Sequence, residues 1–393
     1  MVLIGMFEDE LRTLESESLT RHIYDRLAGI IMPETGLFNK ELARIRILDG
    51  LYINFASNDY LGMAGAATIT DAAVQCITEF GLGAGSSRLL SGGSRYHSAL
   101  EKAVAAFKGT EAALILNSGY IANISILPSI AGDGDVIFSD ELNHASIIDA
   151  CRLSRAQKAI YRHCDTAHLK ELMQTVKARK TIVATDTVFS MDGDIAPLGE
   201  IAALCRHSGS LLYLDDAHGT GVLGNGLGAL AHFGIRAEPW IIQMGTFSKA
   251  LGSYGAFVAG SKNTIDWLIN TARGLIYSTA LPACIAAASL KALEAVQSAT
   301  YLFDRLWQNR ERLFRGLRDL GLNTLSSETP IIPIIVGDVK KTMNISNELL
   351  RRRIYCPAIK PPTVSRPRLR VTATSAHSEE DIDTLLRILK EIL

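Results

Sequence analysis

The sequence predicts an α/β protein, with a mainly parallel central sheet in a large domain and a smaller α+β domain at the carboxyl terminus. Between about residues 98 and 290, short apolar runs alternate with helical segments, as in a parallel sheet covered on both faces. After about residue 290 the segments become longer and more charged. At 393 residues the chain exceeds one ordinary domain.

The large domain is predicted to consist of buried strands separated by helices. Its first helix lies in HSALEKAVAAFKG and ends at Gly109, with an apolar face made of Leu100, Ala103, Val104 and Phe107. Further helices are expected in ELNHASIIDACRLS and LGEIAALCRHSG. The predicted strands are AALILNSG, DVIFSD, TIVATDTVF, SLLYLDDA, PWIIQMGT and AFVAG.

The chain divides into three parts. Residues 1–50 are expected to form a helical arm and a short strand pair, and residues 51–290 the large domain. Residues 291–393 are expected to form the small domain from a long charged helix, the strand TPIIPIIV, the helix NISNELLRRRI, the strand RLRVTAT and a last helix. That last helix begins with Ser378 and Asp381 in capping-box spacing.

Composition narrows the function classes. The formal net charge of -1 gives no general attraction to nucleic acid or to anionic membranes. Six cysteines without a CxxC pair are expected to be reduced and mostly buried. The amino terminus turns acidic too early for a signal peptide, and no segment has the uninterrupted apolar length that a bilayer needs. We therefore expect a cytoplasmic protein.

One lysine stands in an unusual setting. Lys249 follows the apolar run that ends at Met244, among hydroxyls, small residues and glycines, in IIQMGTFSKALGSYGAFVAG. Most lysines lie at the surface with the ammonium in water. An amine held partly out of water loses proton affinity and becomes a nucleophile toward carbonyl groups. Lys249 is therefore a candidate for Schiff-base chemistry.

Reactive side chains follow several predicted strands. Ligands of open α/β sheets bind at the carboxyl ends of the strands. The residues there are Ser118, Gly119, Tyr120, His144, Ser190, Asp215, Asp216, His218, Thr246 and Lys249. Each alone is compatible with a structural role. Together they match pyridoxal phosphate, which needs a lysine for its aldehyde, a carboxylate such as Asp215 for its ring nitrogen, and donors such as the N–H groups of Gly119 and Tyr120 for its phosphate.

Seven stretches extend this pattern from about residue 45 onward. They are NFASNDYLG, GAGSSRLLSG, SGYIAN, ELNHASIIDA, VFSMDGDIAPL, LDDAHGTGVLG and TFSKALGSYG. They resemble the α-oxoamine synthases, pyridoxal-phosphate enzymes with the aspartate-aminotransferase fold, also called fold type I. The resemblance implies a homodimer with shared active sites. It also implies an acyltransferase that condenses a small amino acid with an acyl thioester and releases carbon dioxide.

The resemblance implies a role for each site residue. Lys249 binds the cofactor as a Schiff base and moves the substrate proton, Asp215 pairs with the ring nitrogen, and His218 hydrogen-bonds the ring hydroxyl. His144 stacks on the ring and borders the substrate. The other implied cofactor contacts are Gly119, Tyr120, Ser190 and Thr246, with Ser278 and Thr279 reaching the phosphate of the neighbouring subunit. Asn58 and Arg370 hold the amino-acid carboxylate, a task that suits a guanidinium fork.

Two stretches indicate the substrates. IKPPTVSRPRLRVTATSAH and DDAHGTG are most similar to family members of biotin biosynthesis, which use L-alanine and a pimeloyl thioester of coenzyme A or acyl carrier protein. Lys360 and Thr363 are then expected at the far end of the acyl chain, with Arg21 or Arg26. ELNHASIIDACRLS and TDTVFSMDG, which contains Asp186, look equally like members that use glycine.

Other functions stay open at this point. A related synthase would accept glycine, and an aminotransferase of the same fold would need a keto acid instead of a thioester. A metal-dependent hydrolase would use His144, His163, His168 or His218, but no pair has HExxH-like spacing. A scaffold without activity is the remaining alternative. We expect no metal site.

Overall fold

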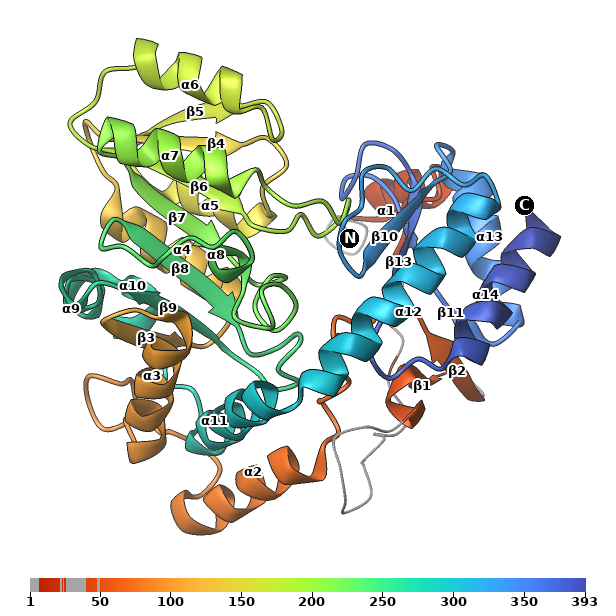
Figure 1. The fold of residues 1–393 in the computed structure, drawn as a ribbon, viewed down its shortest axis with the longest axis horizontal. Helices are drawn as coiled ribbons and strands as arrows, with labels where there is room; N and C mark the ends of the chain where they lie inside the picture. Colours follow the sequence, from red (N-terminus) through yellow and green to blue (C-terminus); the bar gives the residue numbers. More distant parts are fainter. Residues whose placement is uncertain (1–6, 22, 24, 26–39, 48–49) are drawn as a thin grey trace, which may run out of the picture.

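The structure is a computed structural model that describes residues 7–21, 23, 25, 40–47 and 50–393. Figure 1 shows two lobes joined by the long helix α12 (Thr300–Asp319). The larger lobe contains a seven-stranded sheet, and the smaller lobe contains two three-stranded sheets with their helices. The predicted α/β class with a smaller α+β unit is confirmed.

The central sheet has the strand order β3-β9-β8-β7-β6-β4-β5. Its neighbours from β8 to β5 are parallel, whereas β9 runs antiparallel to both β8 and β3. The strands are β3 (Ala112–Leu116), β4 (Val136–Asp140), β5 (Gln157–Tyr161), β6 (Thr181–Asp186), β7 (Leu211–Asp215), β8 (Ile241–Thr246) and β9 (Ala256–Gly260). The sheet is thus mainly parallel, as predicted.

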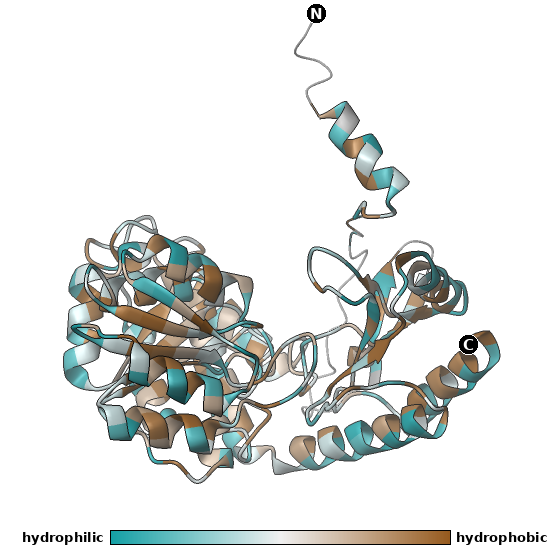
Figure 2. Cartoon of the chain, turned by 90° about the horizontal axis from the view of Figure 1, so that it is seen from above, coloured by the Kyte–Doolittle hydropathy of each residue, from teal (hydrophilic) through white to brown (hydrophobic). Residues whose placement is uncertain are grey.

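Both faces of this sheet are buried because successive side chains point to opposite sides. On β6, Val183 joins the core beneath α3 (Arg95–Lys108), α7 (Leu198–Ser208) and α11 (Ala283–Ser298). Its neighbours Ile182 and Ala184 join a second core, beneath α4 (Gly119–Ile130), α5 (Ala145–Leu153) and α9 (Lys262–Thr271). Figure 2 shows the apolar strands between these helices. Near-continuous apolar runs are what such a doubly covered sheet requires.

Local signals in the sequence fix several helix ends. Helix α3 has a capping box made by Ser94 and His97 and ends at Gly109 in the left-handed conformation. The predicted capping box of Ser378 and Asp381 begins α14 (Glu379–Ile392) and is confirmed. The other helices of the large lobe and the amino-terminal part are α1 (Glu8–Ser16), α2 (Ala67–Phe80), α6 (Thr166–Thr175), α8 (Ala229–His232) and α10 (Arg273–Ile276).

The small lobe recruits strands from the amino-terminal part of the chain. β1 (Arg44–Ile47) pairs with β2 (Gly50–Asn54), and β2 pairs in parallel with β11 (Ile354–Tyr355). The strand pair therefore crosses the expected boundary at residue 50 and belongs to a sheet of the small lobe. The other sheet has the order β10-β13-β12, from β10 (Ile331–Ile335), β13 (Arg368–Thr372) and β12 (Ala358–Ile359). Helix α13 (Val339–Arg351) contacts both sheets.

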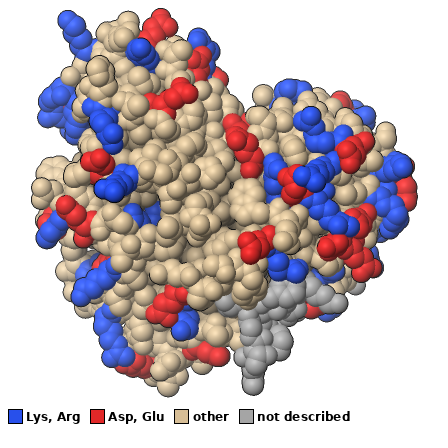
Figure 3. Space-filling view, in the orientation of Figure 1, with Lys and Arg blue, Asp and Glu red and all other residues tan. Residues whose placement is uncertain are grey.

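The surface of the molecule mixes charges of both signs. Figure 3 shows basic and acidic side chains interspersed over the visible face of both lobes. Within the described ranges, no helix is both long and apolar enough to cross a bilayer. All six cysteines are free thiols, and only Cys164 is not fully buried, so that prediction is confirmed.

Candidate active site at the carboxyl edge of the central sheet

Two neighbouring strands bring Lys249 to the carboxylates of the sheet edge. Strand β7 ends at Asp215 and β8 at Thr246, and Asp215 is level with Asp186 on β6. Lys249 follows in the connection from β8 to β9. Burial lowers the pKa of Lys249 to about 8, against the opposing effect of Asp215 and Asp186. At this pKa about one tenth of the amine is uncharged at pH 7.

Asp215 is held by donors on two elements. Its Oδ2 accepts from Asn123 Nδ2 at 2.8 Å, and its Oδ1 accepts from the Ala217 N–H at 3.1 Å. Burial, and after it the neighbouring Asp215, raise the pKa of Asp186 well above its ordinary value. Ionising two adjacent carboxylates together costs free energy, because like charges repel. A cationic partner for Asp215 would relieve this repulsion.

Two histidines border the same space. His218 is buried, its Nδ1 lies 2.6 Å from the Tyr60 hydroxyl, and burial lowers its pKa well below the ordinary value. His144 is the amino-terminal cap of α5; the residue as a whole is exposed, but its ring nitrogen Nδ1 lies in a partly buried contact. Its backbone N–H donates to Asp186 at 2.6 Å, and its Nδ1 lies 2.6 Å from Ser146 Oγ. Desolvation lowers the pKa of His144, against the opposing effect of Asp215.

The start of helix α4 presents hydrogen-bond donors that could hold an anion. Ser118 caps the helix by accepting from the Ile121 N–H, and the N–H groups of Gly119 and Tyr120 have no partner within the helix. A Cβ at Gly119 would lie 2.9 Å from Thr246 Cγ2, so only glycine fits there. Among the described residues Thr246 Oγ1 is buried without a hydrogen-bond partner. An amine, a carboxylate, free N–H groups and an unpaired hydroxyl fit the donor set that pyridoxal phosphate requires.

Arg370 on β13 reaches this space from the small lobe. Its guanidinium donates to the Ser190 backbone oxygen at 2.5 Å and to Asn58 Oδ1 at 3.0 Å. It is close enough to lower the pKa of Lys249. Asn58, Ser190 and Arg370 are therefore brought together, but Ser190 faces Arg370 with its carbonyl group.

Lys360 and Thr363 lie in a separate cavity of about 280 Å³ in the small lobe. Arg21 also lines it and donates to Thr363 Oγ1 at 3.2 Å. Lys360 Nζ donates to the backbone oxygens of Ser18 and Thr20, so this ammonium ties the amino-terminal segment to the lobe. Arg26, the alternative to Arg21, lies outside the described residues.

Ser278 and Thr279 line a recess whose lining residues do not include Lys249. They share this recess with Asn117, whose side chain donates to the Thr279 oxygen at 2.9 Å. Asn117 directly precedes the cap of α4. Thr279 is thus hydrogen-bonded to the residue that precedes the cap of helix α4, and it is exposed.

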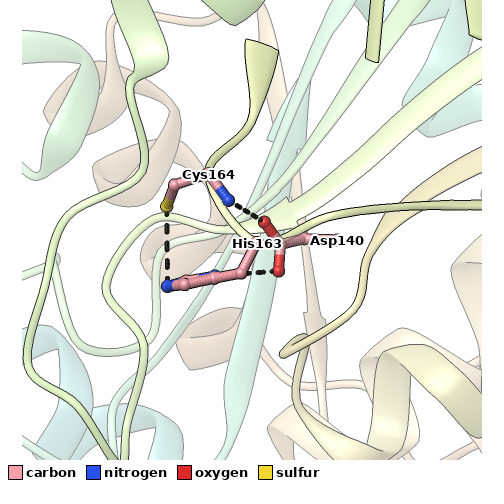
Figure 4. A group of neighbouring side chains, drawn as sticks. All are labelled: Asp140, His163 and Cys164. Atoms are coloured by element: carbon pink, nitrogen blue, oxygen red, sulfur yellow. Dashed lines mark hydrogen bonds and ion pairs between the residues drawn. The ribbon is translucent and has the colours of Figure 1, made fainter. Parts of the chain in front are cut away.

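A second cluster of titratable groups lies at the ends of β4 and β5 (Figure 4). His163 Nδ1 is 3.0 Å from Asp140, and its Nε2 is 2.7 Å from Asp194 and 3.7 Å from Cys164 Sγ. In the part of the chain that the structure describes, each potential metal-ligand group contains His163 as its only histidine. His144, His168 and His218 therefore do not form a metal site with it.

Four site residues were missed by the sequence reasoning. Tyr60 contacts His218, Asn123 contacts Asp215, Ser146 contacts His144, and Tyr213 donates to Asn123 at 2.5 Å. Three of them stand inside quoted motifs, Tyr60 in NFASNDYLG, Asn123 in SGYIAN and Ser146 in ELNHASIIDA. Their place in these motifs was the available signal.

Comparisons with known proteins show the family of the chain. The family model for class I and II aminotransferases matches residues 51–389. A relative from Geobacter metallireducens named 8-amino-7-oxononanoate synthase is 44% identical over 392 residues, 98% of this chain and 97% of its own. That name belongs to an α-oxoamine synthase, so the resemblance is confirmed.

Solved structures share the fold over most or all of the chain. A serine palmitoyltransferase structure containing pyridoxal phosphate is 27% identical, with a TM-score of 0.89 over 100% of this chain and 98% of its own. The 8-amino-7-oxononanoate synthase of Francisella tularensis is 28% identical, with a TM-score of 0.76 over 86% of this chain and 97% of its own. The chain belongs to the class I and II aminotransferase family, with the fold of its pyridoxal-phosphate enzymes.

Proposed function

We propose that the protein condenses L-alanine with a pimeloyl thioester to give 8-amino-7-oxononanoate, carbon dioxide and free thiol, a step of biotin biosynthesis. The observation that carries the proposal is a partly neutral amine, Lys249, that shares one space with Asp215 and the Arg370 guanidinium. The names of the relatives support the same reaction.

Pyridoxal phosphate is the proposed cofactor. When bound, it supplies an aldehyde that joins to amines and a protonated ring that accepts an electron pair from the substrate carbon. Lys249 would hold it covalently, with Asp215 at the ring nitrogen, His218 at the ring hydroxyl and His144 over the ring. Thr246 and the N–H groups of Gly119 and Tyr120 would hold the phosphate.

The chain's own groups then divide the work. Arg370 and Asn58 bind the alanine carboxylate, because a guanidinium accepts a carboxylate in a forked geometry. Lys249, once free of the cofactor, takes the proton from the α carbon and later returns one. Between these transfers a carbon–carbon bond forms at the thioester carbonyl, the carbon–sulfur bond breaks, and the carboxylate leaves as carbon dioxide.

The cavity of the small lobe is the proposed site for the far end of the acyl chain. It combines apolar side chains such as Met343 and Leu350 with the polar groups of Arg21 and Thr363. Cys356 lines this cavity, and its Sγ atom lies 3.8 Å from the backbone oxygen of Arg370. An apolar chain with a terminal carboxylate, as in a pimeloyl group, matches both features.

A homodimer is part of the proposal. Apolar side chains are strongly exposed on α2 and the following loop, where Val74 is 56%, Leu82 70% and Leu90 82% exposed. The backbone of Ser86 in this loop bonds to Ala280, next to Ser278 and Thr279. Such apolar exposure is typical of a subunit interface. Replacing Leu82 and Leu90 together with glutamate is expected to give monomers that bind the cofactor poorly, measured by light scattering and absorbance.

A substrate panel tests the reaction. One missing methyl group changes selectivity by about 1 to 3 kcal/mol, whereas an unpaired polar site can cost a factor of about 10⁴. We expect a modest preference for alanine over glycine and a much larger preference for pimeloyl over acetyl thioesters. Efficient reaction of glycine with acetyl coenzyme A alone would indicate a glycine-using synthase. Transfer of the amino group to a keto acid would indicate an aminotransferase.

A further inference from the structure

Asn123 is a buried amide that links two parts of the site. It lies on α4, directly behind Asp215, and its side chain has no exposed surface. Its Nδ2 is 2.8 Å from Asp215 Oδ2 and 2.8 Å from Ser146 Oγ. Its Oδ1 is 2.5 Å from the Tyr213 hydroxyl. All of its side-chain hydrogen bonds to other residues thus lead toward the active site or to a strand beneath it.

The chemistry of the partners fixes the orientation of this amide. A carboxylate only accepts hydrogen bonds, so the nitrogen of Asn123 must face Asp215. Tyr213 then donates its hydroxyl hydrogen to the amide oxygen. The second hydrogen of the nitrogen goes to Ser146 Oγ, which therefore acts as an acceptor toward Asn123.

The direction of the next bond follows from Ser146. Its backbone N–H donates to His144 Nδ1 at 3.2 Å, so this nitrogen must accept and carries no proton. The Ser146 hydroxyl, 2.6 Å from the same nitrogen, then donates to it as well. A histidine whose Nδ1 accepts is neutral and has its proton on Nε2.

We propose that Asn123 is a positioning residue that holds Asp215 and, through Ser146, fixes His144 as the neutral tautomer protonated at Nε2. This inference rests on the proposed function, in which Asp215 and His144 contact the cofactor. A neutral imidazole can lie against a protonated ring without repulsion between two cations. The Asn123 amide therefore contacts the charged Asp215 directly and, through Ser146, favours a neutral His144.

The first test observes the tautomer directly. In cofactor-loaded protein labelled with [15N]histidine, a His144→Gln variant identifies the His144 signals among those of nine histidines. We expect Nε2 protonated and Nδ1 unprotonated at pH 7. Ser146→Ala removes the hydroxyl donor but keeps the backbone donor, so the signals should move part of the way toward a mixture of tautomers.

The second test uses the affinity for pyridoxal phosphate. Asn123→Ala should raise its dissociation constant about 10- to 100-fold, because Asp215 loses a charge-assisted hydrogen bond. Tyr213→Phe leaves the amide in place and should raise it by less than about fivefold, through looser orientation alone. The matched control is Asn309→Ala, because Asn309 is also a buried amide but donates to the Thr374 and His377 backbone oxygens. That control should lower the melting temperature without changing cofactor affinity or the His144 signals.

A proton on Nδ1 of His144 in the wild-type protein would overturn the inference. So would an Asn123→Ala variant with unchanged cofactor affinity and His144 signals. If Asn123→Ala does not fold, unchanged His144 signals in Ser146→Ala would have the same meaning. These measurements use no substrate, so a failure of the condensation assay with the expected tautomer would overturn the proposed reaction alone.

Discussion

His163 and His218 lie at the same edge of the same sheet, but their surroundings shift them in opposite directions. Burial alone would lower the pKa of His163, yet hydrogen bonds to Asp140 and Asp194 outweigh it and raise this pKa to about 12. His218 has no carboxylate partner among the described residues, and burial followed by Lys249 and Arg370 lowers its pKa. The first region compensates its charge internally. In the second region burial lowers the pKa of both Lys249 and His218, which favours their uncharged forms.

The contrast separates a structural cluster from a reactive one. The His163 cluster joins strand ends to the loop that includes Asp192 and Gly193, and Asp192 forms an ion pair with Arg368. The Gly193 backbone oxygen accepts from Thr329 of the small lobe. A satisfied cation thus fixes the junction between the lobes, whereas the unsatisfied groups beside Lys249 face the proposed cofactor.

The largest effect is expected for Lys249→Ala, which removes both covalent attachment and proton transfer. We expect turnover to fall by at least about 10³-fold. Borohydride treatment of the wild-type protein should attach the cofactor to Lys249, which peptide mass spectrometry can locate. A modified peptide from elsewhere in the chain would contradict the assignment.

Asp215→Asn should have the next largest effect, because a neutral amide cannot keep the ring nitrogen protonated. We expect exchange of the alanine α-proton with deuterated water to slow by about 100-fold or more, measured by NMR. The variant should keep its fold by circular dichroism. Near-normal exchange in this variant would indicate that another residue sets the charge of the ring.

The pKa of Lys249 predicts how cofactor uptake depends on pH. Only the neutral amine attacks an aldehyde, so the rate of covalent incorporation into cofactor-free protein should rise about tenfold per pH unit and level off above about pH 8. The control is lysine amide acetylated on its α nitrogen, which keeps a free side-chain amine in solution. Its rate of reaction with the aldehyde should keep rising to about pH 10.4. A protein rate that parallels the control would exclude a desolvated amine.

His163→Asn should have the smallest effect on activity and a clear effect on stability. The pKa of His163 is raised in the folded state, so its contribution is complete below about pH 6.5 and is lost as pH rises toward about 12. We expect a loss of about 2 kcal/mol at pH 7, since the side chain is 21% exposed and the full cost of breaking a buried pair does not apply. The difference in unfolding free energy between the variant and the wild type, measured by denaturant unfolding, should be smaller at pH 10 than at pH 7.

An unchanged difference between the two proteins at pH 10 would mean that packing, not charge, makes the contribution of His163. A large loss of cofactor affinity in this variant would also break the comparison, because it would move His163 into the reactive region.

Much of the fold could be predicted because doubly covered strands are continuous apolar runs. The prediction missed β5, an edge strand in which only Ala159 and Tyr161 are buried, and β11 and β12, which have two residues each. A two-residue strand is defined only by its hydrogen bonds to a neighbouring strand, so it leaves no recognisable pattern in the sequence.

The candidate site could be predicted where residues follow strands, as Asp215 and Lys249 do. Tyr60 and Asn123 could not be assigned in this way, because their roles depend on hydrogen bonds to residues far along the chain. The hydrogen bonds from the Lys360 ammonium to the backbone oxygens of Ser18 and Thr20 could not be predicted either, because they also join residues far apart in the sequence. Similarity to a known family drew attention to these motifs, but the contacts between their residues became known only from the structure.

The antiparallel strand β9 has a consequence for folding. It pairs with β8 across a short connection, and this connection carries Lys249. Closing a short loop costs less entropy than forming a parallel pair through a crossover, and local contacts form faster. The strand that carries Asp215 joins β8 only through such a longer crossover. Lys249 is therefore positioned by contacts between strands that are close in sequence, whereas the position of Asp215 next to it depends on contacts between strands that are farther apart in sequence.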